Sequence, residues 1–527
     1  MELIKSLGLE SNFTAWDWLI VAVYLVGTVL IGLWVKRYIA DMSDFIVAGR
    51  ALKTRLGVAT MVGTELGLVT IMYSSQKGFT GGFAAFHIAV IAAVVTLVVG
   101  LTGFIVVPLR RMGVMTIPEY YDRRFGRNVR ILGGLILVFA GVLNMGMFLK
   151  AGALFVTGLV GYHDPVFLNT VMTVLLALVI LYTVLGGMVS VVVTDYVQFV
   201  VLSVGLLTAV GLTLYHVGWT NIVDTTLALK GEAGVNPFHK EGFGTSYVVW
   251  MVMLGLVSCA VWQTAVMRAC AAADVKTVKR LYAWSSVGFL IRNLIPYFLG
   301  IGALVYLSQN AATRAVFLPA GGADSETTLM AMPVFLSQIL PVGLIGLIAA
   351  GMLAAFMSTH DSYLLCWSSV LVQDVIAPLA SKDLPVKTRL LLARLFIVLI
   401  GLFLLVWGLY YPLSQDLWDY MAITGAVYFT GATVLLVFGI YWKRASRTGA
   451  YLALASGVIA VLGLGKLQER LLDTVNWVLE HVGAEVAFEP VSSAVIGLIT
   501  VATATVLMVV GSLLRPDRKT VSSEGVS

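Results

Sequence analysis

Long apolar runs recur from one end of this 527-residue chain to the other. Thirteen of them are long enough to cross a bilayer, because a membrane-spanning helix needs about 20 predominantly apolar residues. They lie near 15–35, 55–76, 82–108, 131–160, 166–185, 188–214, 245–270, 282–308, 333–359, 390–411, 418–441, 448–465 and 491–514. The pattern predicts an all-α, polytopic membrane protein of about thirteen transmembrane helices.

The charge content agrees with this fold class and excludes several others. Only 12% of the residues are charged and 59% are hydrophobic, whereas a soluble domain carries about 25% charged residues. Disordered chains, coiled coils, nucleic-acid-binding proteins and soluble enzymes are excluded by that balance. The three cysteines lie within apolar stretches and show no spacing typical of a disulfide framework or a metal site.

Basic residues are distributed unequally between the two sets of loops. One set holds 24 Lys and Arg residues and the opposite set holds seven. Because basic loops remain in the cytoplasm, we expect the N-terminus outside and the C-terminus in the cytoplasm. The chain is therefore expected to be a multi-pass protein of the plasma membrane, in a bacterium the inner membrane.

Charged residues within the apolar runs include Glu65, Lys150, Asp195 and Arg292, together with Arg394, which is close enough to the cytoplasmic end of its run for its side chain to reach water. A charge at the centre of a membrane helix costs about 2.5–3.5 kcal/mol on insertion scales. Each of them therefore needs a partner, a water-filled cavity or a functional role. A mutual Glu65–Lys150 ion pair and separate functional contacts are both compatible with the sequence.

The second run is unusually rich in glycine and polar residues, among them Gly57, Thr60, Gly63, Thr64 and Gly67. Small residues of this kind allow close packing of membrane helices. They also allow a helix to unwind where its backbone faces a cavity, and transporters build ion sites from such broken helices. The sequence leaves both interpretations open.

The ninth run contains a second polar cluster. Ala355, Ser358 and Thr359 are spaced i, i+3 and i+4 and so share one face of a helix. A hard monovalent cation prefers several oxygen ligands, which two hydroxyls and backbone carbonyls supply in part. The alternative is that both hydroxyls donate hydrogen bonds to carbonyls four residues earlier.

Six motifs, taken in order along the chain, resemble the sodium/solute symporter family. This family includes the sodium/proline, sodium/pantothenate, sodium/glucose and sodium/monocarboxylate cotransporters. The resemblance covers roughly residues 15 to 450. The motifs are SDFIVAGRAL (43–52), TIPEYYDRRFG (116–126), LGGMVSVVVTDYVQ (185–198), WQTAVMRACAAAD (262–274), AAFMSTHDSYLLCWSSVLVQDV (354–375) and GIYWKRASRTGA (439–450).

The resemblance implies a LeuT-like core of two inverted five-helix repeats. The implied division is an N-terminal peripheral helix and loop (1–54), a first repeat (55–214), an extracellular loop (215–244), a second repeat (245–441), C-terminal peripheral helices (442–514) and a cytoplasmic tail (515–527). The second and seventh spans open the two repeats, and we expect both to be broken helices.

Carried over residue by residue, the resemblance also implies a sodium site. Its ligands are the carbonyls of Gly63, Leu66 and Ala355 and the hydroxyls of Ser358 and Thr359. Na⁺ is then the ion required, and no other metal is expected.

A second sodium site, or a path for sodium release, is implied by two acidic residues. Asp195 matches a family aspartate near the inner end of the sixth span, although a charge at a helix end near water is the alternative. Glu65 matches an aspartate of the proline-type members and is one carbon longer.

The implied substrate contacts include Arg292, which matches a lysine that touches sugar in the bacterial glucose-type members. A guanidinium binds a carboxylate through two hydrogen bonds, although a structural ion pair is the alternative. Near His87, Ile88 and Ala89 stand where the family's sugar transporters have an acidic residue, which argues against a sugar. The candidate substrate contacts are Glu65, His87, Lys150, Trp262, Gln263, Arg292, Thr424 and Tyr428.

Taken together, these features predict a sodium-coupled secondary active symporter and not an enzyme. Its solute is expected to be small and to bear a carboxylate, as an amino acid or a monocarboxylate does. Spans two, three, four, seven, eight and eleven should line the substrate cavity. The expected partners are the solute, sodium and the lipid bilayer, with no nucleic acid. A proton-coupled transporter of the same fold and a transporter-like solute sensor are the alternatives.

Overall fold

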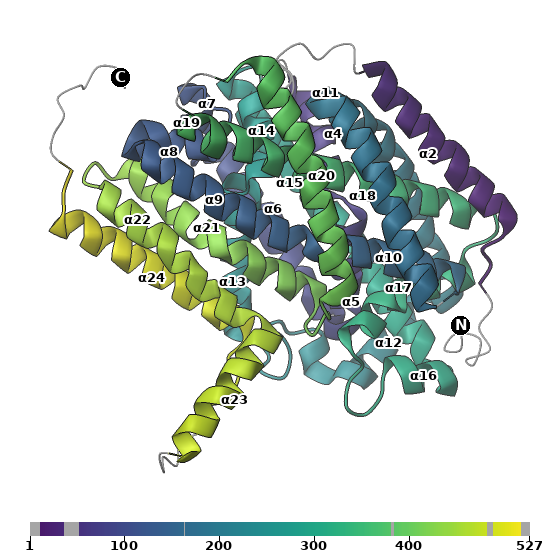
Figure 1. Cartoon of the computed structure of the whole chain (residues 1–527). Helices are drawn as coiled ribbons and strands as arrows, with labels where there is room; N and C mark the ends of the chain where they lie inside the picture. Colours follow the sequence, from purple (N-terminus) through teal and green to yellow (C-terminus); the bar gives the residue numbers. More distant parts are fainter. Residues whose placement is uncertain (1–10, 36–51, 163, 381–383, 482–487, 518–527) are drawn as a thin grey trace.

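The computed structural model of the chain describes residues 11–35, 52–162, 164–380, 384–481 and 488–517, and every regular element in these ranges is helical (Figure 1). The helices of the first half are α2 (Ala15–Val35), α4 (Thr54–Glu65), α5 (Leu68–Gly81), α6 (Phe86–Thr102), α7 (Val106–Met112), α8 (Ile117–Phe125), α9 (Arg127–Asn144), α10 (Phe148–Val160), α11 (Pro165–Val217) and α12 (Trp219–Lys230).

The second half continues in the same way. Its helices are α13 (Gly244–Ala260), α14 (Gln263–Ala271), α15 (Val275–Ser308), α16 (Ala311–Phe317), α17 (Ser325–Ile339), α18 (Leu344–Val370), α19 (Ala377–Leu379), α20 (Val386–Tyr410), α21 (Leu417–Tyr441), α22 (Arg447–Ser456), α23 (Gly465–His481) and α24 (Ser493–Leu514). Short 3₁₀ segments are Gly82–Ala85, Met145–Met147, Gly231–Gly234 and Gly457–Gly463, and Leu371–Ile376 is a π-helical turn.

Several helices begin where the sequence provides a side-chain cap. The carboxylates of Asp164, Asp274 and Asp324 accept hydrogen bonds from backbone N–H groups three residues later, at 3.2, 2.7 and 3.0 Å. Such N-caps satisfy donors that have no partner within the helix and contribute about 1 kcal/mol each. These three aspartates fix the starts of α11, α15 and α17.

Within the described ranges, eight helices are long and apolar enough to cross a membrane, or up to ten if each sharply bent pair of helices is one span. The predicted fold class is thus confirmed, while the count of thirteen stays a prediction. Two predicted spans, 166–185 and 188–214, belong to the single 53-residue helix α11. At 1.5 Å per residue this helix is about 80 Å long, which exceeds one crossing of a hydrocarbon core of about 30 Å.

The predicted ninth span, 333–359, has the wrong bounds. Pro341 falls between α17 and α18, so the long apolar helix runs from Leu344 to Val370 instead. The Ser358–Thr359 pair consequently lies in the middle of a helix and not near its end. The division of the chain into inverted repeats stays a prediction.

Both helices expected to be broken are broken. Leu66 and Gly67 separate α4 from α5, and Val261 and Trp262 separate α13 from α14, which meet at 41°. These breaks put irregular backbone at the depth of the membrane, where a cavity or surrounding protein must satisfy its polar groups.

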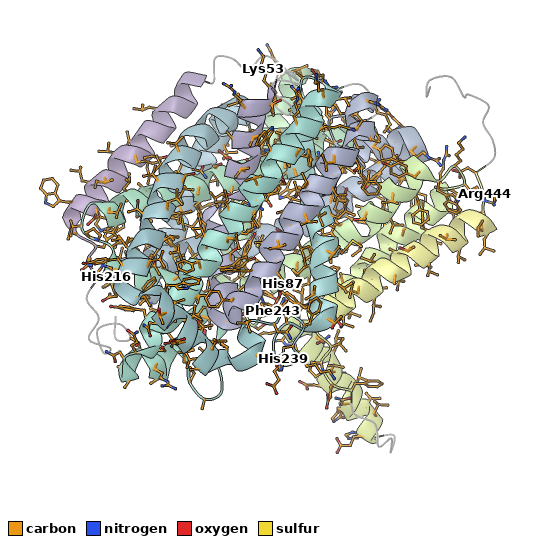
Figure 2. The ribbon with its side chains drawn as sticks, turned by 180° about the vertical axis from the view of Figure 1, so that it is seen from behind. Lys53, His87, His216, His239, Phe243 and Arg444 are labelled. Atoms are coloured by element: carbon orange, nitrogen blue, oxygen red, sulfur yellow. The ribbon has the colours of Figure 1, made fainter. Side chains whose placement is uncertain are left out.

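The halves α5 and α14 of the broken helices are buried within the bundle, whereas α4 and α13 each keep an exposed face. Along their lengths α15 packs against α6 and α5, and α11 packs against α18. Helices α2 and α24 lie on opposite flanks, and α23 projects away from the bundle (Figure 1). We call the end that carries Lys53 and Arg444 the basic end, and the end that carries His239 the far end (Figure 2).

Candidate functional site

A cavity of about 110 Å³ lies between the two broken helices, several times the volume that one water molecule requires. Its walls come from α5, α6, α9, α10, α13, α15, α18 and α21. Each of the six spans expected to line the substrate cavity contributes, and α18 adds a seventh wall. The lining residues are mostly apolar with a few polar groups, as in many small-molecule sites.

Helix α15 supplies the charged group of this cavity. Arg292 lines it, is 8% exposed, and its guanidinium carbon lies 4.2 Å from the centre of the Phe289 ring. Asn293 and Tyr297 line the cavity from the same helix. A cation, an amide and a phenol therefore reach the cavity within two turns of one helix.

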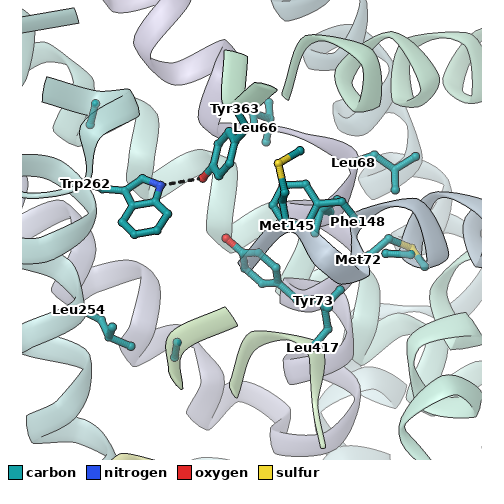
Figure 3. Packing of buried hydrophobic residues seen from close by; sticks show 14 of the residues in the cluster. Leu66, Leu68, Met72, Tyr73, Met145, Phe148, Leu254, Trp262, Tyr363 and Leu417 are labelled. Atoms are coloured by element: carbon teal, nitrogen blue, oxygen red, sulfur yellow. Dashed lines mark hydrogen bonds between the residues drawn. The ribbon is translucent and has the colours of Figure 1, made fainter. Parts of the chain in front are cut away.

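Aromatic side chains form the wall nearer the basic end. The indole N–H of Trp262, at the break between α13 and α14, donates to the hydroxyl of Tyr363 on α18 at 3.1 Å (Figure 3). The Trp367 ring packs edge-on against Trp262, with 5.3 Å between centroids. The broken seventh span is thus joined to α18 at the wall of the cavity that lies nearer the basic end.

The other break meets the polar cluster of α18. A Cβ atom at Gly67 would lie 2.0 Å from the Thr359 hydroxyl oxygen, so only glycine allows the backbone to approach so closely. Thr359 lines the cavity, and its hydroxyl donates to the Ala355 carbonyl at 2.9 Å. This hydroxyl therefore makes the hydrogen bond to the carbonyl four residues earlier that was the alternative to ion binding. Its oxygen nevertheless lies beside the break between α4 and α5.

Three more members of the expected sodium site lie close by. The Gly63 carbonyl accepts a hydrogen bond from the Leu66 N–H at 3.1 Å, where α4 ends. Ser358 is buried on α18, 2% exposed. The structure therefore brings the break after α4 and the polar cluster of α18 side by side. The side chains of Glu65 and Asp195 lie outside the described residues.

The expectation that Lys150 contacts substrate is not supported by its position. Lys150 is absent from the cavity lining and forms an ion pair with Glu326 on α17, and its ammonium lies 3.5 Å from the Tyr411 carbonyl. The structural ion pair is therefore the better interpretation, with Glu326 as the partner. An apolar run shows that Lys150 needs a partner but not which one.

Three further candidates lie behind the cavity wall. The Gln263 side-chain oxygen accepts from the Ile117 N–H at 2.9 Å, which joins α14 to α8. Tyr428 shares a hydrogen bond of 3.0 Å with Tyr121. Thr424 is buried and donates to the Tyr420 carbonyl at 2.7 Å. None of the three lines the cavity in the described part of the chain.

His87 also lies outside the lining residues. Its Nδ1 lies 2.6 Å from the Ala84 carbonyl, and its ring packs edge-on against Phe243 at 4.9 Å. The two residues lie close together toward the far end (Figure 2). Its neighbour Ile88 lines the cavity instead.

The prediction missed several polar residues of the cavity. Asn144 lies where α9 ends, and its amide donates to the Met421 carbonyl at 2.6 Å. Tyr73 and Trp418 pack ring against ring at 4.7 Å on the wall nearer the far end. An asparagine inside an apolar run is a signal in the sequence, whereas tyrosine and tryptophan are too common in membrane helices to be one.

Beyond Tyr73, toward the far end, buried charge joins α5 to the start of α21. The Lys77 ammonium lies 2.8 Å from a carboxylate oxygen of Asp416 and 2.8 Å from one of Asp419. The Tyr247 hydroxyl donates to the other oxygen of Asp419 at 3.0 Å. Lys77 is one of the seven basic residues that the sequence assigns to the outer set of loops, and this assignment is wrong, because the residue lies within α5 and is 5% exposed.

Toward the basic end, backbone groups join the two broken helices. The Leu52 N–H donates to the Ala271 carbonyl at 3.1 Å, and the Ala273 N–H donates to the Leu52 carbonyl at 3.0 Å. Arg110 donates to the carbonyls of Ala272 and Ala273 at 2.7 and 2.9 Å. These bonds join the start of α4 to the end of α14.

Comparisons with known proteins agree with this geometry. A family model described as the sodium:solute symporter family matches residues 45–457. The sodium/glucose cotransporter 4 of Danio rerio is 26% identical over 481 residues, which cover 84% of this chain and 70% of the relative. The sodium/myo-inositol cotransporter of Bos taurus is 26% identical over 495 residues, which cover 85% of this chain and 66% of the relative.

Solved structures share the fold. A substrate-bound, outward-open structure of a Na⁺-coupled sialic acid symporter matches with a TM-score of 0.78 and 20% identity, over 95% of this chain and 98% of that one. A nucleobase-cation-symport-1 family transporter in a closed conformation matches with a TM-score of 0.52 and 12% identity, over 90% and 95%.

Proposed function

This chain belongs to the sodium:solute symporter family, and from that premise we propose that it imports a small carboxylate-bearing solute together with sodium. The family makes the chain a sodium-coupled membrane transporter and not an enzyme, with Na⁺ as the coupling ion. The identity of the solute is the part that we propose.

One observation carries the choice of solute, namely the position of Arg292 in the cavity wall. A guanidinium at this depth is costly unless it serves a purpose. It offers two parallel N–H donors that match a carboxylate. Lys150, the other basic residue first considered for this role, pairs with Glu326, so the proposal depends on Arg292.

The neighbouring polar groups favour hydroxyl or amine groups on the same solute. Asn144, Asn293 and Tyr297 line the cavity around the arginine, and amides and phenols both donate and accept hydrogen bonds. Amino acids and hydroxylated acids combine a carboxylate with such groups.

A neutral sugar or polyol is the second candidate. The relatives named above are cotransporters of glucose and myo-inositol, and Asn144 and Asn293 are suited to hydroxyl groups. For this candidate Arg292 would donate to hydroxyl oxygens instead of a carboxylate.

We propose that sodium binds where the break after α4 faces α18. The carbonyls of Gly63, Leu66 and Ala355 and the hydroxyls of Ser358 and Thr359 would be its ligands. Support comes from the contact between Gly67 and Thr359. Asp195 and Glu65 stay proposed members of a second site or a release path.

In the proposed cycle, sodium and solute enter from the far end while the Lys77 ion pairs are open, and leave from the basic end. Sodium binding holds α4 against α18 and so favours the conformation that accepts solute. The coupling is reciprocal, so the solute must raise sodium affinity by the same factor. A membrane potential of 100 mV contributes about 2.3 kcal/mol for each sodium charge. The basic end then faces the cytoplasm of a plasma membrane.

Uptake into proteoliposomes tests the solute. Arg292→Gln is compared with Arg470→Gln, an exposed arginine on α23, against a panel of amino acids, monocarboxylates and neutral sugars. We expect carboxylates to be accumulated and Arg292→Gln alone to reduce their apparent affinity at least about tenfold, since a charged hydrogen bond contributes about 1.5–3 kcal/mol. Accumulation of neutral sugars alone would reject the carboxylate proposal.

The sodium site has its own test. Ser358→Ala/Thr359→Ala is compared with Ser368→Ala/Thr433→Ala, two buried hydroxyls that donate to local carbonyls. Loss of two ligands should weaken sodium activation by about a hundredfold, while the control pair keeps it. If sodium-dependent accumulation survives in the first variant, the proposed ligands are wrong.

Replacing sodium by choline at fixed pH separates the remaining alternatives. A symporter of this family stops accumulating solute, whereas a proton-coupled transporter continues. A solute sensor would bind solute without net accumulation in either medium.

A further inference from the structure

A groove of about 800 Å³ runs along the outside of α4 and α15, apart from the central cavity. Nine residues line it: Thr54, Arg55, Val58, Val62, Arg280, Trp284, Val287, Gly288 and Ile291. Five of the nine are large hydrophobic residues, two are arginines, and none of these described lining residues is acidic.

One side of the groove is an apolar face of α15. Trp284, Val287 and Ile291 are 66%, 52% and 50% exposed, and their spacing of three and four residues places them on one face of the helix. In the bilayer such a face contacts lipid chains. The floor lies at Gly288, where a Cβ atom would come within 2.5 Å of a Val62 methyl.

The two charges of the groove lie together at one end. Arg55 is in the first turn of α4 and Arg280 is in the second turn of α15, and both are exposed. Lys53, which precedes α4, marks this as the basic end (Figure 2). Guanidinium groups bind phosphate through two parallel hydrogen bonds.

We propose that this groove binds a phospholipid with an anionic headgroup. The headgroup phosphate pairs with Arg55 and Arg280, and an acyl chain lies along Val58, Val62, Val287 and Ile291. Basic pockets between transmembrane helices are known to take anionic headgroups. A free phosphate would use only the arginines and leave the apolar length of the groove empty, so the amphipathic ligand fits the whole groove.

Lipid bound in this groove should also affect transport, and this part of the inference rests on the proposed function. Helix α4 carries Gly63 and ends beside Thr359. A lipid that bridges α4 and α15 holds this half-helix in place, so its loss should weaken sodium activation.

Retention of lipid by the purified full-length protein tests the binding. The protein is exchanged into an equal mixture of dioleoyl phosphatidylglycerol and dioleoyl phosphatidylcholine, and retained lipid is measured by native mass spectrometry. Arg55→Gln/Arg280→Gln is compared with Arg127→Gln/Arg444→Gln, which removes two exposed arginines outside the groove. We expect preferential retention of phosphatidylglycerol, reduced about tenfold in the first variant only. Equal retention in both variants overturns the proposal.

A second variant keeps the charges and fills the groove. Val287→Trp/Ile291→Trp changes two half-exposed positions, so the fold should tolerate it, and it should also lose phosphatidylglycerol. Displacement of the lipid by millimolar inorganic phosphate alone, with no effect of the tryptophans, would identify a free-anion site and reject the lipid. Because these measurements need no transport, they fail independently of the proposed function.

Discussion

The helices around the central cavity are joined by different chemistry at its two ends. At the far end one ammonium, from Lys77, holds the carboxylates of Asp416 and Asp419. At the basic end Leu52 is joined to Ala271 and Ala273 by backbone hydrogen bonds, and Arg110 donates to the Ala272 carbonyl between them.

The two kinds of contact differ in the free energy that is lost when they separate. A charge pair with a buried member leaves uncompensated charge if one partner is removed, at a cost of about 3–5 kcal/mol. A backbone hydrogen bond that opens into water exchanges one partner for another, at a net cost of about 0.5–1.5 kcal/mol. The far end should therefore be the more sensitive of the two to substitution.

The largest effect is expected for Lys77→Met. It leaves two carboxylates whose side chains are 23% and 21% exposed, so we expect a cost of about 3 kcal/mol, the lower limit for breaking a buried pair. A cysteine introduced at Thr70, in the cavity wall, should then react faster with a membrane-impermeant thiol reagent from the far side. The three native cysteines are buried. Lys466→Met, at an exposed site, is the control, and equal labelling in both variants contradicts the prediction.

Gly67→Ala addresses the region between the two ends. The added methyl would lie 2.0 Å from the Thr359 oxygen, whereas Gly211 has nothing within 4 Å. Overpacking of this kind costs about 1–3 kcal/mol, so the variant should require about tenfold more sodium for half-maximal uptake. Gly211→Ala should behave as the parent protein. Unchanged sodium activation in Gly67→Ala would mean that the contact has no part in ion binding.

Arg110→Gln tests the basic end. It removes two charged hydrogen bonds to the carbonyls of Ala272 and Ala273, partly exposed to water, and should cost about 1.5 kcal/mol. A cysteine introduced at Ser258, on the cavity side of α13, should then react faster with the thiol reagent from the basic side. This increase in labelling rate should be smaller than the increase that Lys77→Met causes from the far side. The comparison fails if Arg110→Gln has the larger effect. Arg127→Gln serves as the control.

The smallest effect is expected for Trp262→Phe, which keeps the ring and removes its donor to Tyr363. Loss of one neutral hydrogen bond costs about 1 kcal/mol, or about a fivefold rise in KM for solute. Trp477→Phe, on the projecting helix α23, should leave KM unchanged. A change in sodium activation without a change in KM would place Trp262 outside the solute wall.

The sequence predicts some of these features and not others, for a physical reason. The break after α4 follows from glycine and polar residues in an apolar run, because their cost is local. Lys150 and Arg292 look alike in the sequence, since each is a lone cation in an apolar run. Only tertiary contacts distinguish them. Lys150 forms an ion pair with Glu326, 176 residues further along the chain, whereas Arg292 lines the cavity.

The sequence does not predict the ion pairs at the far end, for the same reason. Lys77 follows a polar stretch, which resembles the end of a span, and Asp416 and Asp419 precede another apolar run. Residues near the ends of spans are read as loop residues unless their partners are known. The ion pairs appear only when α5 and α21 are packed together.

The bridge between Leu52 and Ala272 has one more consequence. Its two bonds use only main-chain atoms of Leu52, Ala271 and Ala273, so a side-chain substitution at any of the three leaves every donor and acceptor in place unless proline replaces Leu52 or Ala273. A systematic alanine scan would find Lys77 at once, but it changes nothing at Ala271 and Ala273, and at Leu52 it measures the loss of a buried side chain and not of the two bonds. A survey that ranks the two ends of the cavity by the effects of side-chain substitutions will therefore underestimate the basic end, whose contact uses the peptide backbone. Changes to the backbone itself, such as amide-to-ester replacement, are needed to detect that contact.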